Sequence, residues 1–213
     1  MKGVKRVKTV AVTGGIGSGK TALCSYLAGK WVPVYDSDQA AKRLYDISPD
    51  LVAAIRSAFG PDVAPDGKID RKALAAVVFS DPQGRTQLEE LVHPVVKADF
   101  IRWREGVMAG LPASWCGYTS TPFVVMESAI ILSKPLFDDV YDVSLAVTAP
   151  MDVRLERVLR RDGISREGAL SRMESQEESF ARAAAVLANE GTLKELFGRA
   201  DALFADWFGR PRS

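Results

Sequence analysis

The stretch that decides the fold is Val10-Ala11-Val12-Thr13-Gly14-Gly15-Ile16-Gly17-Ser18-Gly19-Lys20-Thr21. A run of apolar, β-branched residues leads into a glycine-rich turn, and a lysine and a hydroxyl side chain follow it. The spacing from Gly14 to Thr21 fits the pattern G-x-x-x-x-G-K-[ST] of a phosphate-binding P-loop between a strand and a helix. We therefore predict a P-loop here, in preference to a strand-turn-helix junction that merely happens to be rich in glycine.

A P-loop must direct several backbone N–H groups at phosphate oxygens. Four glycines are expected to permit positive φ and close approach of the ligand because they carry no Cβ: Gly14, Gly15, Gly17 and Gly19. Lys20 adds a positive charge and is a catalytic candidate, and the helix after it directs its positive dipole end at the same anion. The Thr21 hydroxyl is placed to bind Mg²⁺ beside the phosphates. The predicted nucleotide-binding residues of the loop are Gly14, Gly15, Ile16, Gly17, Ser18, Gly19, Lys20 and Thr21.

The amino-acid composition is typical of a globular protein. The chain has 213 residues, of which 47% are hydrophobic and 26% charged, and its formal net charge is +1. This charge argues against a generally basic nucleic-acid binder. Cys24 and Cys116 have no metal-ligand or redox spacing, which favours a reducing compartment, and no apolar run approaches the roughly 20 residues that span a bilayer. We expect a cytoplasmic protein without membrane or nucleic-acid partners.

Predicted strands and helices alternate along the chain. Short apolar runs predict strands at 9–12, 32–35, 123–126, 143–147 and 186–188. Helical spacing and capping residues predict helices at 21–30, 39–45, 51–59, 71–79, from 81–82 onward, 151–161, from 165 onward, and 192–208. This alternation is typical of an α/β protein, with three layers and a mostly parallel sheet.

Two aspartates follow the second predicted strand. Asp36 and Asp38 should lie at the carboxyl edge of the sheet, where open α/β sheets bind ligands. The alternative for each of them is that it is a loop residue or caps the helix that follows, a position at which aspartate is favoured.

Three further features carry possible chemistry. Glu127 ends a buried strand, so it could hold magnesium through water or simply cap the strand's exit. His93, the one histidine of the sequence, lies next to Pro94 in a helical pattern and could be a structural hydrogen-bonding group. Arginines crowd the segment around Gly163 and could either close onto phosphate or form a solvated helix face: Arg154, Arg157, Arg160, Arg161, Arg166 and Arg172.

Several segments together narrow the choice among P-loop proteins. They are Thr13–Lys20, then Val34-Tyr35-Asp36-Ser37-Asp38, then His93-Pro94, then Arg160–Arg166, then Arg172-Met173. Their order and spacing resemble those of the dephospho-CoA kinases over nearly the whole chain. The resemblance implies a three-layer α/β/α P-loop NTPase fold with a helical acceptor-binding insertion and a lid. It also implies that ATP phosphorylates the 3′-hydroxyl of the dephospho-CoA ribose, the last step of coenzyme A synthesis.

The same resemblance assigns roles and boundaries. A single kinase domain, 1–213, would have its core at about 7–36, 122–150 and 183–213, its helical acceptor region at about 37–121 and its lid at about 151–182. Asp38 would orient the acceptor hydroxyl or take its proton, and Asp36 would face both substrate and magnesium. His93 and Glu127 would bind substrate, Arg157 and Arg161 would be the catalytic lid arginines, and Asn189 would border the adenine.

The chain departs from the family pattern at one place and leaves two other functions to consider. Ser133 stands where many dephospho-CoA kinases carry a glutamate, so the role of that acid is open unless Glu127 covers it. One alternative function is another P-loop kinase acting on a nucleoside, nucleotide or small metabolite. The other is a nucleotide-dependent switch, although the sequence contains no guanine-reading N-K-x-D element. The sequence leaves the oligomeric state undetermined.

Overall fold

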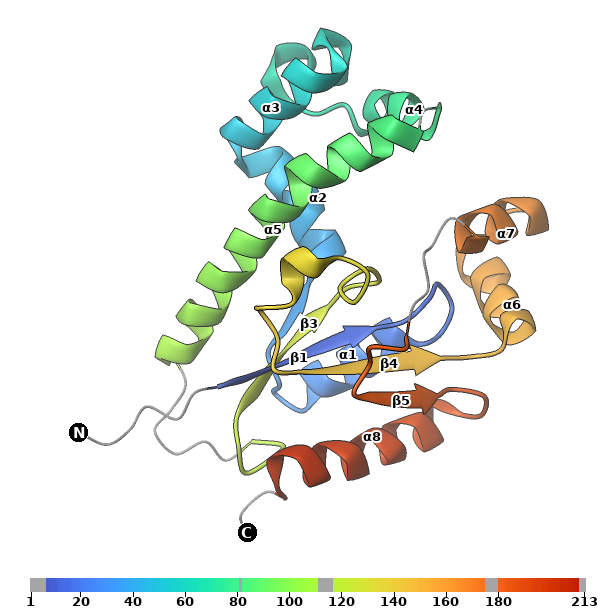
Figure 1. Ribbon diagram of the computed structural model, residues 1–213. Coiled ribbons are helices and arrows are strands. Elements are labelled where there is room, and N and C mark those ends of the chain that lie inside the picture. The colour runs from blue at the N-terminus through green and yellow to red at the C-terminus, as the bar shows by residue number, and fades with distance from the viewer. Residues whose placement is uncertain (1–6, 81, 111–116, 175–179, 211–213) are drawn as a thin grey trace. The chain divides into compact units, whose positions relative to one another are not determined.

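The computed structural model describes residues 7–80, 82–110, 117–174 and 180–210 (Figure 1). They belong to two compact units. Residues 1–35 and 104–213 form the first, which we call the sheet unit, and residues 36–103 form the second, which we call the helical unit. Cys116, Asp81 and the parts of the predicted acceptor region and lid at 111–116 and 175–179 lie outside the described residues.

The sheet unit is built on a five-stranded sheet with the order β2-β3-β1-β4-β5. β1 is parallel to β3 and β4, and β4 is parallel to β5, which confirms the predicted α/β class. The parallel register pairs Val12 with Glu127, so the end of β3 lies beside the start of the glycine-rich loop. The strand bounds are β1 Lys8–Thr13, β2 Val34–Asp36, β3 Phe123–Glu127, β4 Val143–Thr148 and β5 Ala185–Ala188.

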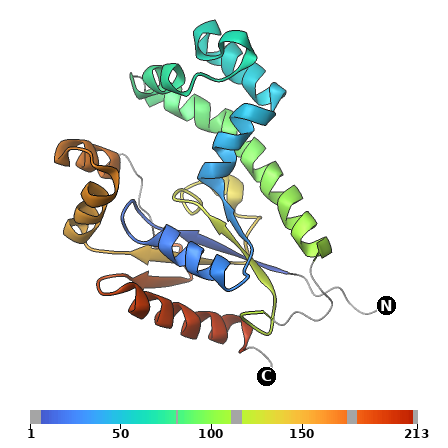
Figure 2. The same ribbon diagram turned by 180° about the vertical axis from the view of Figure 1, so that it is seen from behind.

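Helices α1 (Lys20–Gly29) and α8 (Leu193–Phe208) cover one face of this sheet (Figures 1 and 2). Their apolar side chains form one buried cluster with alternate residues of the central strands. Rings of Phe123 and Phe204 stack with centroids 5.1 Å apart. The predicted cap of the last helix is present as a full capping box, in which Thr192 and Glu195 satisfy each other's backbone N–H groups.

The opposite face is covered by the segment that follows β3 and by the end of the long helix α5 (Pro82–Gly110). Successive strand side chains point to opposite faces, so Thr9 and Thr13 face away from α1 and α8. Arg104 of α5 donates to Thr9 Oγ1 at 3.3 Å and to the Val140 carbonyl at 3.0 Å, and Thr13 Oγ1 donates to the Ala129 carbonyl at 3.2 Å. The sheet is therefore the middle of three layers.

A pair of helices follows β4. α6 (Met151–Asp162) and α7 (Arg166–Glu174) are separated at Gly163, which has φ +62 and ends α6, as the Asp162-Gly163 step predicts. Their buried residues, among them Val158 and Met173, form a small apolar cluster against which Ile16 packs. The glycine-rich loop thus contacts this helix pair through its own apolar side chain.

The helical unit contains α2 (Ser37–Ile47), α3 (Pro49–Phe59), α4 (Arg71–Ser80) and most of α5, with two short 3-10 turns at Pro61–Val63 and Pro65–Gly67. Helices α2 and α3 each begin two residues earlier than predicted, where Asp36 and Ser48 cap them by accepting from Gln39 N and Leu51 N. α2 also ends two residues later than predicted. An ion pair joins Arg43 of α2 to Asp99 of α5, and a second joins Arg71 to Asp46 at 2.7 Å.

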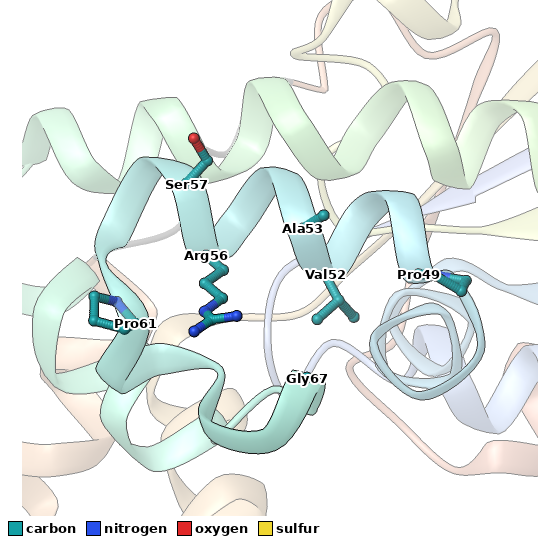
Figure 3. Close-up of a pocket in the computed structure, with 7 residues that line it drawn as sticks. All are labelled: Pro49, Val52, Ala53, Arg56, Ser57, Pro61 and Gly67. Atoms are coloured by element: carbon teal, nitrogen blue, oxygen red, sulfur yellow. The ribbon is translucent and has the colours of Figure 1, made fainter.

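A cavity of about 500 Å³ lies between α3 and the turns at 61–67 (Figure 3). It is lined by Val52 and Arg56 of α3 together with Pro61, and it contains none of the predicted site residues. Among the described residues, no helix is both long and apolar enough to cross a membrane.

Two tyrosines share one carboxylate where α1, α8 and the segment before β3 meet. Tyr26 and Tyr118 both donate to Asp201, at 2.9 Å and 2.5 Å. Burial together with the bond to Asp201 raises the pKa of Tyr26 to about 12, and the same causes raise the pKa of Tyr118 further above its ordinary value. Each phenol thus holds its proton more tightly in the folded chain than in the unfolded one.

We predict that the free energy of unfolding falls as the pH rises from about 10, where unfolded tyrosines ionise, through about 12, the pKa of folded Tyr26. Urea titrations at several pH values would measure this slope. Asp201→Asn should flatten it because both phenols lose a charged acceptor. The matched control is Asp206→Asn, an exposed position on the same helix, and equal slopes in the two variants would contradict the assignment.

Candidate active site

The predicted P-loop forms the connection between β1 and α1, and three of its glycines, Gly14, Gly17 and Gly19, are sterically required. Gly17 has φ +79 and Gly19 has φ +101. A Cβ at Gly19 would lie 2.2 Å from Asn189 Nδ2, and one at Gly17 would lie 2.5 Å from the Arg154 carbonyl oxygen. No other residue type fits these positions without displacing a neighbour.

The expectation of positive φ is met at Gly14, whose φ is +152, but Gly15 is not among the glycines with positive φ. The Gly15 carbonyl accepts a hydrogen bond from Ser18 N at 3.1 Å, which closes a four-residue turn. The first residue of such a turn requires no left-handed backbone. Gly15 therefore begins the turn, and Gly17 supplies its unusual conformation.

Every carbonyl group from residue 15 to residue 19 accepts a hydrogen bond. The donors are Ser18 N to Gly15, Arg154 Nε to Ile16 at 2.8 Å, Arg157 to Gly17 at 3.3 Å, Asn189 Nδ2 to Ser18 at 2.8 Å and Leu23 N to Gly19 at 3.0 Å. Within the described part of the chain, the N–H groups of Gly17, Gly19 and Lys20 donate no such bond. Carbonyls bound to the protein and N–H groups left available are the arrangement that an anion-binding loop needs.

Lys20 and Thr21 meet the same carboxylate oxygen. Glu127 Oε1 accepts from Lys20 Nζ at 2.8 Å and from Thr21 Oγ1 at 2.6 Å. The Lys20 and Glu127 side chains are only 12% and 6% exposed. Burial alone would raise the pKa of Glu127, but the Lys20 charge and hydrogen bonds from Lys20, Thr21 and Cys24 outweigh it and lower that pKa. Glu127 is thus a carboxylate that balances the charge of the loop lysine.

The arginines of α6 divide into two groups. Arg154 and Arg157 turn toward the glycine-rich loop and donate to its carbonyls, and Arg157 also donates to the Asn189 carbonyl at 3.1 Å. Arg161, the second predicted catalytic arginine, instead donates twice to Asp162, at 2.6 and 3.0 Å. That pairing lowers the pKa of Asp162. The structure therefore brings Arg157 to the loop and places Arg161 in an ion pair at the end of the helix.

Sequence reasoning did not select Arg154 as a site residue. Its side chain is almost completely buried, yet nothing in the sequence separates it from the exposed arginines of the same segment. Arg154 lies three residues before Arg157, so both are on one face of the helix, and this spacing could have indicated that Arg154 also reaches the loop.

Asn189 lies directly after β5 and is buried against the loop. Its Nδ2 atom donates to the Ser18 carbonyl, its backbone N–H donates to the Thr148 carbonyl at 2.6 Å, and its amide group is the neighbour that a Cβ at Gly19 would strike. Asn189 therefore helps to shape the loop, and its nucleotide-binding role stays a prediction.

The three acceptor-side candidates belong to the helical unit. Asp36 Oδ1 accepts from Gln39 N at 2.9 Å, so Asp36 is the residue that caps α2. Asp38 lies one residue into that helix and is exposed, and His93 is half-buried in α5 next to Pro94. The capping alternative considered for both aspartates is thus observed for Asp36.

Comparisons with known proteins show which family the chain resembles. A family model described as dephospho-CoA kinase matches residues 8–195. The chain is 39% identical to the dephospho-CoA kinase of Porphyromonas gingivalis over 179 residues, which are 83% of this chain and 82% of that protein. The crystal structure of TT1252 from Thermus thermophilus aligns with a TM-score of 0.75 at 33% identity, covering 96% of this chain and all of that one. The dephospho-CoA kinase of Campylobacter jejuni shares the fold, with a TM-score of 0.55 at 21% identity over 94% of this chain and 97% of that one.

We predict that Gly19→Ala lowers the free energy of unfolding by about 2 kcal/mol or more. The alanine would have to adopt φ +101, and its Cβ would lie 2.2 Å from Asn189 Nδ2. Chemical denaturation would measure the change. Gly29→Ala in α1 is the matched control, since a Cβ there meets open space; its stability should be unchanged or higher by up to about 1 kcal/mol. Equal stability of both variants would show that the loop tolerates a side chain at Gly19.

Proposed function

This chain belongs to the dephospho-CoA kinase family, and we propose that it transfers the γ-phosphoryl group of ATP to the 3′-hydroxyl of the dephospho-CoA ribose. The observation that carries the donor half is the loop at 14–21, with its carbonyls bound to protein and its N–H groups available beside Lys20. Phosphoryl transfer depends mainly on positioning and on neutralising charge. The loop positions the phosphates, and Lys20 together with the α1 dipole neutralises their charge.

The ion pair of Lys20 with Glu127 suggests how the donor site changes when ATP binds. In the proposed complex, Lys20 Nζ turns from Glu127 toward the phosphate oxygens, because the phosphates carry more negative charge than one carboxylate. Glu127 then keeps its contact with Thr21.

The donor set beside the loop suits Mg²⁺, which prefers oxygen ligands and retains several waters. The hydroxyl of Thr21 and the carboxylate of Glu127 lie 2.6 Å apart, so we propose that these two side chains hold the ion, Thr21 directly and Glu127 through water. The ion would neutralise charge on the transferring phosphoryl group. Asp36, the other predicted ligand, already caps α2 with one carboxylate oxygen.

We propose the acceptor role for Asp38. As Asp36 provides the cap of α2, Asp38 is not required for that purpose, and its exposed carboxylate could orient the ribose hydroxyl or accept its proton. His93 is proposed to bind the acceptor from α5. Arg157 is the proposed catalytic arginine next to the loop, whereas Arg161 would have to leave Asp162 before it could reach phosphate.

Because both proposed substrates are small, water-soluble metabolites, we also propose a cytoplasmic location with neither membrane nor nucleic acid as a partner. The alternative of another small-acceptor kinase is not favoured by the comparisons, since the family model and the relative from Porphyromonas gingivalis both bear the name dephospho-CoA kinase.

We predict that the purified protein converts ATP and dephospho-CoA to ADP and coenzyme A in the presence of Mg²⁺, as chromatographic separation of the products would show. Lys20→Ala should lower kcat by at least about a hundredfold, because it removes the charge beside the transferring group. Lys194→Ala, an exposed position at the start of α8, is the control and should retain activity. Folded wild-type protein that binds ATP but forms no coenzyme A would refute the proposed reaction.

A second prediction separates the acceptor side from the donor side. Asp38→Asn should lower kcat by about a hundredfold and change the Kd of an ATP analogue by less than about threefold, because the role proposed for the carboxylate is at the acceptor hydroxyl. Asp50→Asn is the matched control, since Asp50 is an exposed aspartate in the first turn of α3 within the same unit. Near-normal turnover of the Asp38 variant would remove Asp38 from the catalytic role.

A further inference from the structure

A buried arginine connects α6 to the phosphate-binding loop. Arg154 is 6% exposed, and its Nε atom donates to the Ile16 carbonyl at 2.8 Å. The backbone of Arg154 also packs against the loop, because a Cβ on Gly17 would lie 2.5 Å from the Arg154 carbonyl oxygen. The side chain and the main chain of one residue therefore both border the Ile16–Gly17 peptide group.

Burying a guanidinium group is unfavourable unless its donors are satisfied. The neighbours of Arg154 on α6, Leu155 and Val158, are apolar core residues, so a hydrophobic side chain would suit this position better if only packing mattered. The hydrogen bond to Ile16 gives the arginine a specific task at the loop.

The orientation of one peptide group explains that task. The Ile16 carbonyl and the Gly17 N–H belong to the same planar unit and point in opposite directions. Holding the carbonyl toward Arg154 therefore holds the N–H toward the interior of the loop, where it donates to no other described residue. Arg157 donates to the carbonyl of the next peptide, that of Gly17, whose N–H belongs to Ser18 and donates to the Gly15 carbonyl.

We propose that Arg154 is a positioning residue for the nucleotide: it orients the Ile16–Gly17 peptide so that the Gly17 N–H binds a phosphate oxygen. The inference rests on the proposed function only in taking ATP as the ligand. It also assigns the first turns of α6, within the predicted lid at 151–182, to the phosphate site itself, because Arg154 and Arg157 bind the carbonyls of the loop.

Three variants test the role of Arg154. Arg154→Gln removes the guanidinium, Arg154→Lys keeps a cationic donor, and Arg199→Gln is the matched control. Arg199 is exposed on α8, and its Nε also donates to a backbone carbonyl, that of Glu195 at 3.4 Å, but within its own helix. For each variant we would measure the Kd of a fluorescent ATP analogue without acceptor, the KM values of both substrates, and thermal stability.

Arg154→Gln should raise the Kd and the KM for ATP about tenfold and leave the KM for dephospho-CoA within twofold, as expected for loss of one charged hydrogen bond at the donor site. Arg154→Lys should recover part of the loss, and Arg199→Gln should bind the analogue like wild type. Unchanged ATP binding in folded Arg154→Gln, or an equal rise of both KM values, would overturn the proposal. If Arg154→Gln does not fold, Arg154→Leu takes its place, because leucine suits the apolar neighbours Leu155 and Val158 but cannot donate to the Ile16 carbonyl, and an unchanged Kd in that variant overturns the proposal.

The binding measurement needs no acceptor, so its outcome is separate from that of the proposed reaction. A wild-type protein that binds the analogue without making coenzyme A would refute the reaction, and the comparison of Arg154→Gln with wild type would still decide the role of Arg154.

Discussion

The structure depends on hydrogen bonds that hold the carbonyl groups of one loop away from its centre. A peptide group presents its N–H and its carbonyl on opposite sides, so a loop that offers N–H groups to an anion must satisfy its carbonyls elsewhere. Here the donors for residues 16, 17 and 18 are the side chains of Arg154, Arg157 and Asn189. They come from α6 and from the end of β5, so distant parts of the chain determine the shape of the loop.

The parallel sheet brings these parts together. Because β1, β3, β4 and β5 run in the same direction, their carboxyl ends meet at one edge. The loop follows β1, and Glu127 at the end of β3 lies beside Lys20. α6 follows β4, and Asn189 follows β5. The pairing of Val12 with Glu127 places the carboxylate next to the lysine although 107 residues separate them in the chain.

The donor and acceptor sides are built differently. All groups described around the loop belong to the sheet unit, where buried ion pairs and hydrogen bonds define each position. The acceptor candidates Asp38 and His93 belong to the helical unit, whose helices are joined by ion pairs such as that of Arg71 with Asp46. The residues proposed for the donor and those proposed for the acceptor therefore belong to different units of the chain.

Local pattern determined most of the elements and the identity of the loop. Apolar runs and caps such as Thr192 depend on neighbouring residues, so the sequence predicted the strands, the helices, Gly19 and Lys20, and the order of its motifs indicated the family. Among the arginines of one amphipathic helix it selected Arg161 and not Arg154, and it left Glu127 between two roles. Only the tertiary structure decided these points: which arginine is buried against the loop, and which carboxylate meets Lys20, follow from the packing of strands and helices that are far apart in the chain.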